Sequence, residues 1–231
     1  MNIEIEAKPS YGMATVALNP GEDFVAESGA MVAMSPNLTV NTRFNGTGTG
    51  GFLDWLQAAI TGLLRKIIAG ETLFVNHYQA KTAGEVMLAP SMIGDVVKVD
   101  VDDINPITVQ TTSYMGSSTG VSIDLIWAGF SMLFSKEGAF FMRCKGRGPM
   151  LINAYGAIEE VEIHGSYRVD TGHVVAFKGD LQYAIRRVGG WKATLLSGEG
   201  LVLEFTGTGT LWLQTRNINA TVSWLTPILP A

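Results

Sequence analysis

Two stretches decide the fold: SKEGAFFMRCKGRGPMLINAYG at residues 135–156 and SGEGLVLEFTGTGTLWLQTR at residues 197–216. They align with an offset of 62 (197 minus 135), and a fainter third copy, AGETLFVNHYQAKTAGEVMLAP, occupies residues 69–90. In each copy a glutamate precedes a run of β-forming residues, a glycine-bearing turn and a second such run. The three glutamates are Glu71, Glu137 and Glu199. Internal repetition of this kind indicates a tandem architecture.

Two further elements recur around these copies. GDVVKVDV from Gly94 matches GAIEEVEI from Gly156, again 62 apart (156 minus 94). A third element appears as LNPGEDFVAESGAM, VQTTSYMGSS and VDTGHVVAF, which begin at Leu18, Val109 and Val169. The order of the elements predicts one compact domain over residues 1–231, built of three β units at 18–101, 107–163 and 167–227.

Short strands separated by glycine turns predict an all-β fold. We expect a tandem three-unit β repeat, sandwich-, barrel- or prism-like, around a pseudo-threefold axis. Such an arrangement would hide the sheet edges of the units against one another. In the third unit, Leu201–Phe205 and Leu211–Leu213 flank Gly207 and Gly209, which predicts a β-hairpin with its turn at these glycines.

One segment breaks the β pattern. Residues 51–69, GFLDWLQAAITGLLRKIIA, predict an amphipathic helix inserted in the first unit. This helix either covers the core or faces a partner or membrane, and its contact surface would then include Phe52, Trp55 and Leu56. A second apolar stretch at 125–134 contributes Trp127 and Phe130. Because two apolar insertions would leave an exposed patch unless a partner covers them, we expect a homo-oligomer.

Composition excludes several classes of protein. Charged residues are 16% of the chain, hydrophobic residues 47%, and 27 residues are glycine, which argues against disorder and against a mostly helical chain. A net charge of −5 argues against nucleic-acid binding. Cys144 is the only cysteine, so one chain holds no disulfide. The N-terminal residues show no leader pattern and no stretch predicts a spanning helix, so we expect a cytoplasmic protein.

The motifs that carry chemistry are sparse, and we expect a non-enzymatic protein without a cofactor. Gly46–Gly51 matches G-x-G-x-x-G, but a dinucleotide fold needs alternating strands and helices, so we interpret this run as a connection. His77, His164 and His173 have no counterparts in the other units. The glutamates 71, 137 and 199 either cap backbone donors at their turns or converge to bind a cation, and both interpretations stay open.

Several repeat elements together resemble a known family. GEDFVAESGAMVAM, GRGPMLINAYG, VDTGHVVAF and SGEGLVLEFTGTGTLWLQTR are similar to the altered-inheritance-of-mitochondria protein 24 family, from about Pro20 to Arg216. The resemblance implies tandem copies of a β architecture like that of the tryptophan RNA-binding attenuator protein, and no catalytic residues. Mitochondrial members are linked to inner-membrane organisation and carry an N-terminal extension. From its absence here we expect a bacterial or archaeal cytosolic protein.

Three functions follow as hypotheses. The first is a non-enzymatic binding or scaffold protein that self-associates through its apolar insertions. The second is a peripheral membrane-associated protein that uses the 51–69 helix. The third is a protein that binds a metal or small ligand at the repeated glutamate turns.

Overall fold

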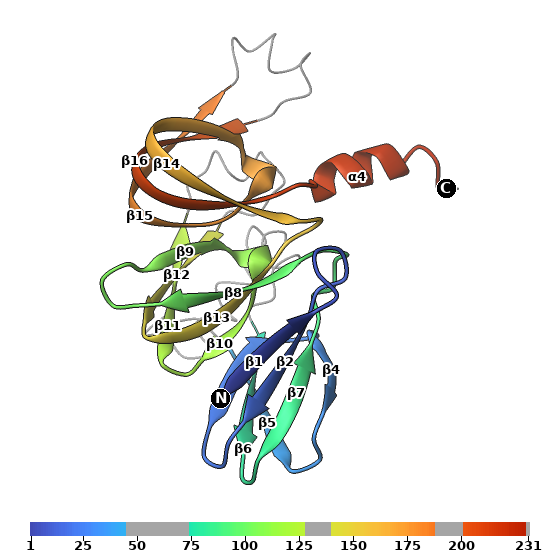
Figure 1. The fold of residues 1–231 in the computed structure, drawn as a ribbon. Helices are drawn as coiled ribbons and strands as arrows, with labels where there is room; N and C mark the ends of the chain where they lie inside the picture. The colour runs from blue at the N-terminus through green and yellow to red at the C-terminus, as the bar shows by residue number, and fades with distance from the viewer. Residues whose placement is uncertain (45–73, 128–139, 188–200, 230–231) are drawn as a thin grey trace, which may run out of the picture.

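The computed structural model describes residues 1–44, 74–127, 140–187 and 201–229, and these residues fold into three antiparallel sheets (Figure 1). Sheet A contains, in spatial order, β1 (Asn2–Glu6), β2 (Met13–Leu18), β7 (Gly84–Leu88) and β4 (Met31–Met34). Sheet B contains β5 (Leu38–Phe44), β6 (Phe74–Ala80), β3 (Asp23–Glu27), β10 (Tyr114–Ser118), β13 (Gly148–Asn153) and β8 (Val96–Val101). Sheet C contains β11 (Val121–Trp127), β12 (Phe140–Gly146), β9 (Ile107–Gln110), β15 (Val174–Arg187), β16 (Leu201–Gln214) and β14 (Ile158–Asp170).

The all-β tandem repeat predicted from the sequence is confirmed, and the described strands form open sheets without a closed barrel. Alternation of apolar residues explains the strands. In β2 every second side chain is buried, because successive side chains of a strand point to opposite faces of its sheet. The predicted helix at 51–69 lies outside the described residues.

The repeat extends to the register of strand pairing. One strand of each unit carries a bulge at the same place: between Met31 and Ala33 in β4, between Tyr114 and Gly116 in β10, and between Val174 and Ala176 in β15. Single turns of 3-10 helix, η1 (Thr111–Ser113) and η3 (Thr171–His173), precede the bulged strand in the second and third units. Ala33, Gly116 and Ala176 are therefore equivalent positions.

Neighbouring units share sheets rather than meeting as separate bodies. In sheet B, the bulged strand β10 of the second unit pairs with β3 of the first, with Gly116 opposite Ala26. In sheet C, the bulged strand β15 of the third unit pairs with β9 of the second, with Ala176 opposite Val109. Sheets B and C each contain strands of two neighbouring units, so the units are joined by continuous backbone hydrogen bonding.

Three hydrophobic clusters lie between these layers. The first includes Phe24, Tyr78 and Leu151, and the second includes Ile107, Cys144 and Trp212. The third includes Phe177 and Phe205 on the long strands β15 and β16, together with Phe141 of β12. Each core therefore combines side chains of neighbouring units, as expected when a single repeat cannot bury both of its faces alone.

The predicted hairpin at Gly207 and Gly209 is wrong. Residues 201–214 form one continuous strand, β16, which is paired along its length with β14 on one side and β15 on the other. Gly207 has φ +122° and faces Gly165, and a Cβ at this position would collide with the Asp180 carbonyl oxygen. The glycine thus bends a long strand without interrupting its pairing, a role that a glycine in a strand also takes.

A short helix that the sequence analysis did not predict follows β16. Helix α4 (Ile218–Leu225) extends away from the sheets toward the C-terminus (Figure 1). The Asn217 side chain caps it by accepting hydrogen bonds from the backbone N–H groups of Asn219 and Ala220. The Thr221 hydroxyl donates to the Tyr155 hydroxyl at 3.2 Å, which fixes the first part of α4 to the β units.

Candidate functional site

The exposed edge of sheet A is the first candidate site. β4 pairs with β7 and with no second strand of the described chain, yet its sequence, MVAM, is entirely apolar. All four of its residues are exposed, and Val32 keeps 57% of its surface in contact with solvent. An exposed apolar edge strand presents unpaired backbone groups to any other strand. The first unit therefore carries a surface suited to pairing with another chain.

The opposite edge of the same sheet is built differently. β1 has the sequence NIEIE, in which Glu4 and Glu6 place negative charge along the free edge. Charged side chains on an edge strand oppose pairing with a second strand, because the pairing would bring them out of water. Of the two edges of sheet A, β4 alone is left open to association in this way.

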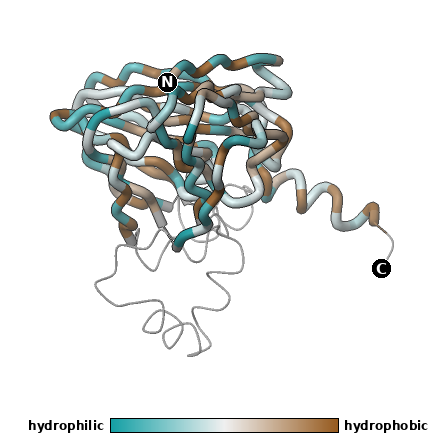
Figure 2. The backbone as a smooth tube through the Cα atoms, turned by 90° about the horizontal axis from the view of Figure 1, so that it is seen from below, coloured by the Kyte–Doolittle hydropathy of each residue, from teal (hydrophilic) through white to brown (hydrophobic). Residues whose placement is uncertain are grey.

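Helix α4 forms the second exposed apolar surface. None of its residues is buried, and Ile218, Val222, Trp224 and Leu225 are all exposed. Trp224 has 67% of its surface exposed. Apolar positions recur along this helix where it leaves the body of the molecule (Figure 2). The chain from Asn217 to Leu229 contains no charged residue, so this surface offers apolar contacts without ion pairs.

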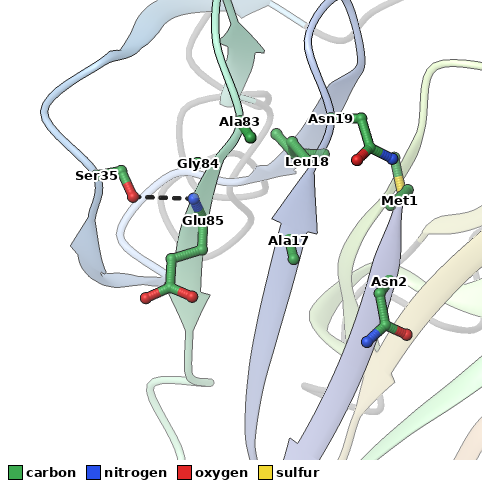
Figure 3. Close-up of a pocket in the computed structure, with 9 residues that line it drawn as sticks. All are labelled: Met1, Asn2, Ala17, Leu18, Asn19, Ser35, Ala83, Gly84 and Glu85. Carbon is green, nitrogen blue, oxygen red and sulfur yellow. Dashed lines mark hydrogen bonds between the residues drawn. The ribbon is translucent and has the colours of Figure 1, made fainter.

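A cavity of about 440 Å³ lies at one end of sheet A, beside the residue that follows β4 (Figure 3). Met1, Leu18, Asn19, Ser35 and Glu85 are among the residues that line it. The Ser35 hydroxyl oxygen accepts a hydrogen bond of 3.0 Å from the Glu85 backbone N–H. The cavity is thus close to β4 and part of its lining is already hydrogen bonded internally.

A carboxylate neighbouring this cavity is also engaged. The N-terminal amino group of Met1 donates to Glu22 Oε1 at 2.6 Å, and the backbone N–H of Asn19 donates to Glu22 Oε2 at 2.8 Å. The hydrogen bond from the amino group, followed by that from Asn19, lowers the pKa of the Glu22 carboxyl below its ordinary value. Glu22 therefore stays charged at neutral pH and ties the start of β1 to the turn after β2.

Groups that could do chemistry are placed elsewhere. The Cys144 thiol is buried in the second core, and burial raises its pKa to about 12, so it is protonated at neutral pH and unsuited to nucleophilic attack. His77 Nε2 lies 3.6 Å from Asp23 Oδ2, and Asp23 also accepts a hydrogen bond from Thr119. Within the described part of the chain, no three His, Cys, Asp or Glu side chains gather as a metal site would require.

The site residues predicted from the sequence lie outside the described side chains. Glu71, Glu137 and Glu199 fall in residues that the structure does not describe, as do Phe52, Trp55, Leu56 and Phe130, and of Trp127 only the backbone is described. Their roles stay predictions. The sequence analysis quoted the segment that contains β4 only as a repeat element. The absence of charge between Glu27 and Ser35 was the signal that could have marked it as a contact surface.

The comparisons with known proteins place the chain in a family. A family model described as mitochondrial biogenesis AIM24 matches residues 3–216, which is nearly the whole chain. The chain belongs to the AIM24 family. The chain is also similar to an uncharacterised protein of Streptococcus pyogenes serotype M6, M6_Spy0233, with 25% identity over 233 residues that cover 100% of this chain and 92% of the relative.

The AIM24 fold is also seen in a crystal structure. Protein SPYM3_0169 from Streptococcus pyogenes superposes with a TM-score of 0.79, covers 99% of each chain and is 24% identical. This likeness shows the fold. No helix among the described residues of this AIM24 chain is long and apolar enough to cross a membrane.

Proposed function

We propose that this AIM24-family protein is a non-enzymatic scaffold that self-associates through its exposed apolar surfaces. The observation that carries the proposal is β4, an edge strand whose four residues are apolar and exposed. Proteins that remain monomeric protect such edges with charges, prolines, bulges or a covering segment. β4 has a bulge in its pairing with β7, but the side chains on both of its faces remain exposed.

The absence of charged residues on β4 and α4 supports a protein partner for these two surfaces. A surface helix that binds anionic lipid places lysines and arginines beside its apolar face, whereas α4 contains no charged residue and β4 contains none. Apolar side chains without adjacent charge are typical of the buried centre of protein–protein interfaces. The insertions at 51–69 and 125–134 remain a further predicted surface for the same self-association.

Non-catalytic function is part of the proposal. The Glu22 carboxylate beside the cavity is bonded to Met1 and Asn19, so it already has its partners without a substrate. The lone thiol is held protonated inside a core. These contacts favour a role in which the protein binds through its surface.

Native mass spectrometry of the purified full chain over a range of concentrations tests this function. We expect an oligomer whose mass is an integral multiple of the chain and whose population increases with concentration. A monomer at every concentration would contradict self-association, and a mass that includes a tightly held metal or metabolite would instead identify a ligand-binding protein.

A further inference from the structure

The contacts between units inside one chain define what β4 lacks. The bulged strand of the second unit lies against β3 of the first unit, and the bulged strand of the third unit lies against β9 of the second. β4 is the bulged strand of the first unit, with the same register on its inner side, and no unit precedes it in the described chain. The first unit therefore presents the bulged-strand half of an inter-unit contact with its other half missing.

Side chains of β4 are exposed where the equivalent side chains of the second and third units are buried. Val32 is equivalent to Met115 and Val175, since each lies one residue before the aligned positions Ala33, Gly116 and Ala176. Met115 and Val175 are fully buried, whereas Val32 is 57% exposed. Met31 is likewise exposed, while its equivalents Tyr114 and Val174 are buried. β4 thus has the sequence of a buried strand and the environment of a surface strand.

The third unit carries the complementary half. β3, β9 and the last part of β14 are equivalent, because Ala26, Val109 and Val169 occupy the same position before the bulged strand. Phe24 and Ile107, two residues earlier, are fully buried, whereas the equivalent Tyr167 is 41% exposed. β14 is an edge strand of sheet C and pairs only with β16 among the described strands. Its residues 166–170 therefore form a second open edge.

These two edges match each other in register and chemistry. We propose that two copies of this chain associate head to tail, with β4 of one copy pairing antiparallel with residues 166–170 of the next. The register of the internal contacts places Ala33 opposite Val169, Met34 opposite Arg168 and Ser35 opposite Tyr167. β4 carries no charge, so no like charge faces Arg168. The inference rests on the proposed function and names the surface, the partner and the pairing.

Continuity with the existing sheets favours a second copy over an unrelated protein. Sheets B and C each reach six strands by joining two units, whereas sheet A stops at four strands with β4 at its edge. Pairing with residues 166–170 of another copy would extend sheet A in the manner of sheets B and C. Both halves of the contact occur on every chain, so each copy can bind one neighbour at β4 and another at β14. Such heterologous contacts build a ring if the rotation closes and a filament if it does not.

Substitution of each edge tests the inference in the full chain. Val32→Lys places a charge where the equivalent Met115 and Val175 are fully buried. Tyr167→Lys places a charge on the partner edge, where the equivalent Phe24 and Ile107 are fully buried. Each variant is therefore expected to weaken association by about 100-fold or more. Ile104→Lys is the matched control, because Ile104 is 86% exposed and lies at neither edge. Sedimentation velocity is expected to show monomers for the two edge variants and wild-type association for the control.

Mixing the two edge variants distinguishes head-to-tail pairing from other arrangements. Val32→Lys retains an intact β14 edge and Tyr167→Lys retains an intact β4, so an equimolar mixture is expected to form a dimer of the two variants and nothing larger. If Tyr167→Lys alone assembles like the wild type while Val32→Lys does not, β4 pairs with itself and the inference is overturned. If both assemble like the wild type, the inference fails and the scaffold function survives through another surface. A wild-type monomer at all concentrations overturns both.

An engineered disulfide tests the head-to-tail pairing even if an edge variant fails to fold. The register places Ser35 opposite Tyr167 of the neighbouring copy, as Ser118 lies opposite Phe24 inside the chain. A chain with both Ser35→Cys and Tyr167→Cys is expected to form disulfide-linked multimers under mild oxidation, whereas either single variant is not. Cys144 does not compete, because it is buried. A covalently closed monomer would show instead that the first and third units of one chain pair with each other.

Discussion

Replacement of Phe205 by alanine tests whether the units fold as one body. Phe205 is fully buried in the third core, with its ring centroid 5.2 Å from that of Phe177 and 6.3 Å from that of Tyr183. Removing a buried phenylalanine side chain costs about 3–5 kcal/mol, because apolar contacts are lost and a cavity remains. The edge-to-face contact with Phe177 accounts for about 1 kcal/mol of this loss.

The same substitution reports on coupling between units. Because β15 pairs with β9, the third unit shares sheet C with the second, and a loss in one core should destabilise both. Chemical denaturation followed by circular dichroism and by tryptophan fluorescence is expected to show one transition at lower denaturant for Phe205→Ala. Phe205→Leu keeps most of the apolar volume, so the denaturant concentration at its midpoint should lie between those of Phe205→Ala and the wild type. Two separate transitions in Phe205→Ala, with the first two units unaffected, would refute the coupling.

Three further predictions follow from individual contacts. Hydrogen bonds from Arg168 and the charges of Arg168 and Arg186 lower the pKa of the Glu204 carboxyl. The contribution of this carboxylate to stability is therefore complete above its ordinary pKa and is lost as the pH falls through the lowered value. Glu204→Gln should flatten the acid side of a plot of melting temperature against pH, and an unchanged acid side would contradict this. Leu225→Asp should leave the melting temperature nearly unchanged, since no side chain of α4 is buried, whereas a drop of more than about 5 °C would place α4 in the folded core. Cys144 should resist a maleimide in the native protein and react after unfolding, and rapid native labelling would show that the second core opens.

The sequence was sufficient for the class of fold and the repeat, because strand alternation and glycine spacing are local patterns. It was insufficient at Gly207, where the same glycine signal serves a tight turn or a bend in a continuous strand. Only the pairing of β16 with strands on both sides distinguishes these, and that pairing is set by residues far away in the chain. Helix α4 was missed because its eight residues are short for a periodic signal and follow a strong strand.

The recognition of β4 as a contact surface depended on tertiary structure even more than the assignment of β16 did. Val32 is apolar like its equivalents Met115 and Val175, so the residue type at this position does not distinguish the exposed copy from the buried ones. Whether a strand is buried or exposed depends on whether a preceding unit lies beside it, and this is a property of position in the tandem array. The residues predicted as contact and cation sites, such as Trp55 and Glu137, stay predictions.

Hydrogen–deuterium exchange at low and high protein concentration tests whether β4 pairs with residues 166–170 of a second copy. We expect the backbone amides of β4 and of residues 166–170 to gain protection together as concentration rises, while those of β1, at the opposite edge of sheet A, do not change. Exchange that is independent of concentration at both edges, in a sample that is oligomeric by mass, would show that copies of this chain meet through a different surface.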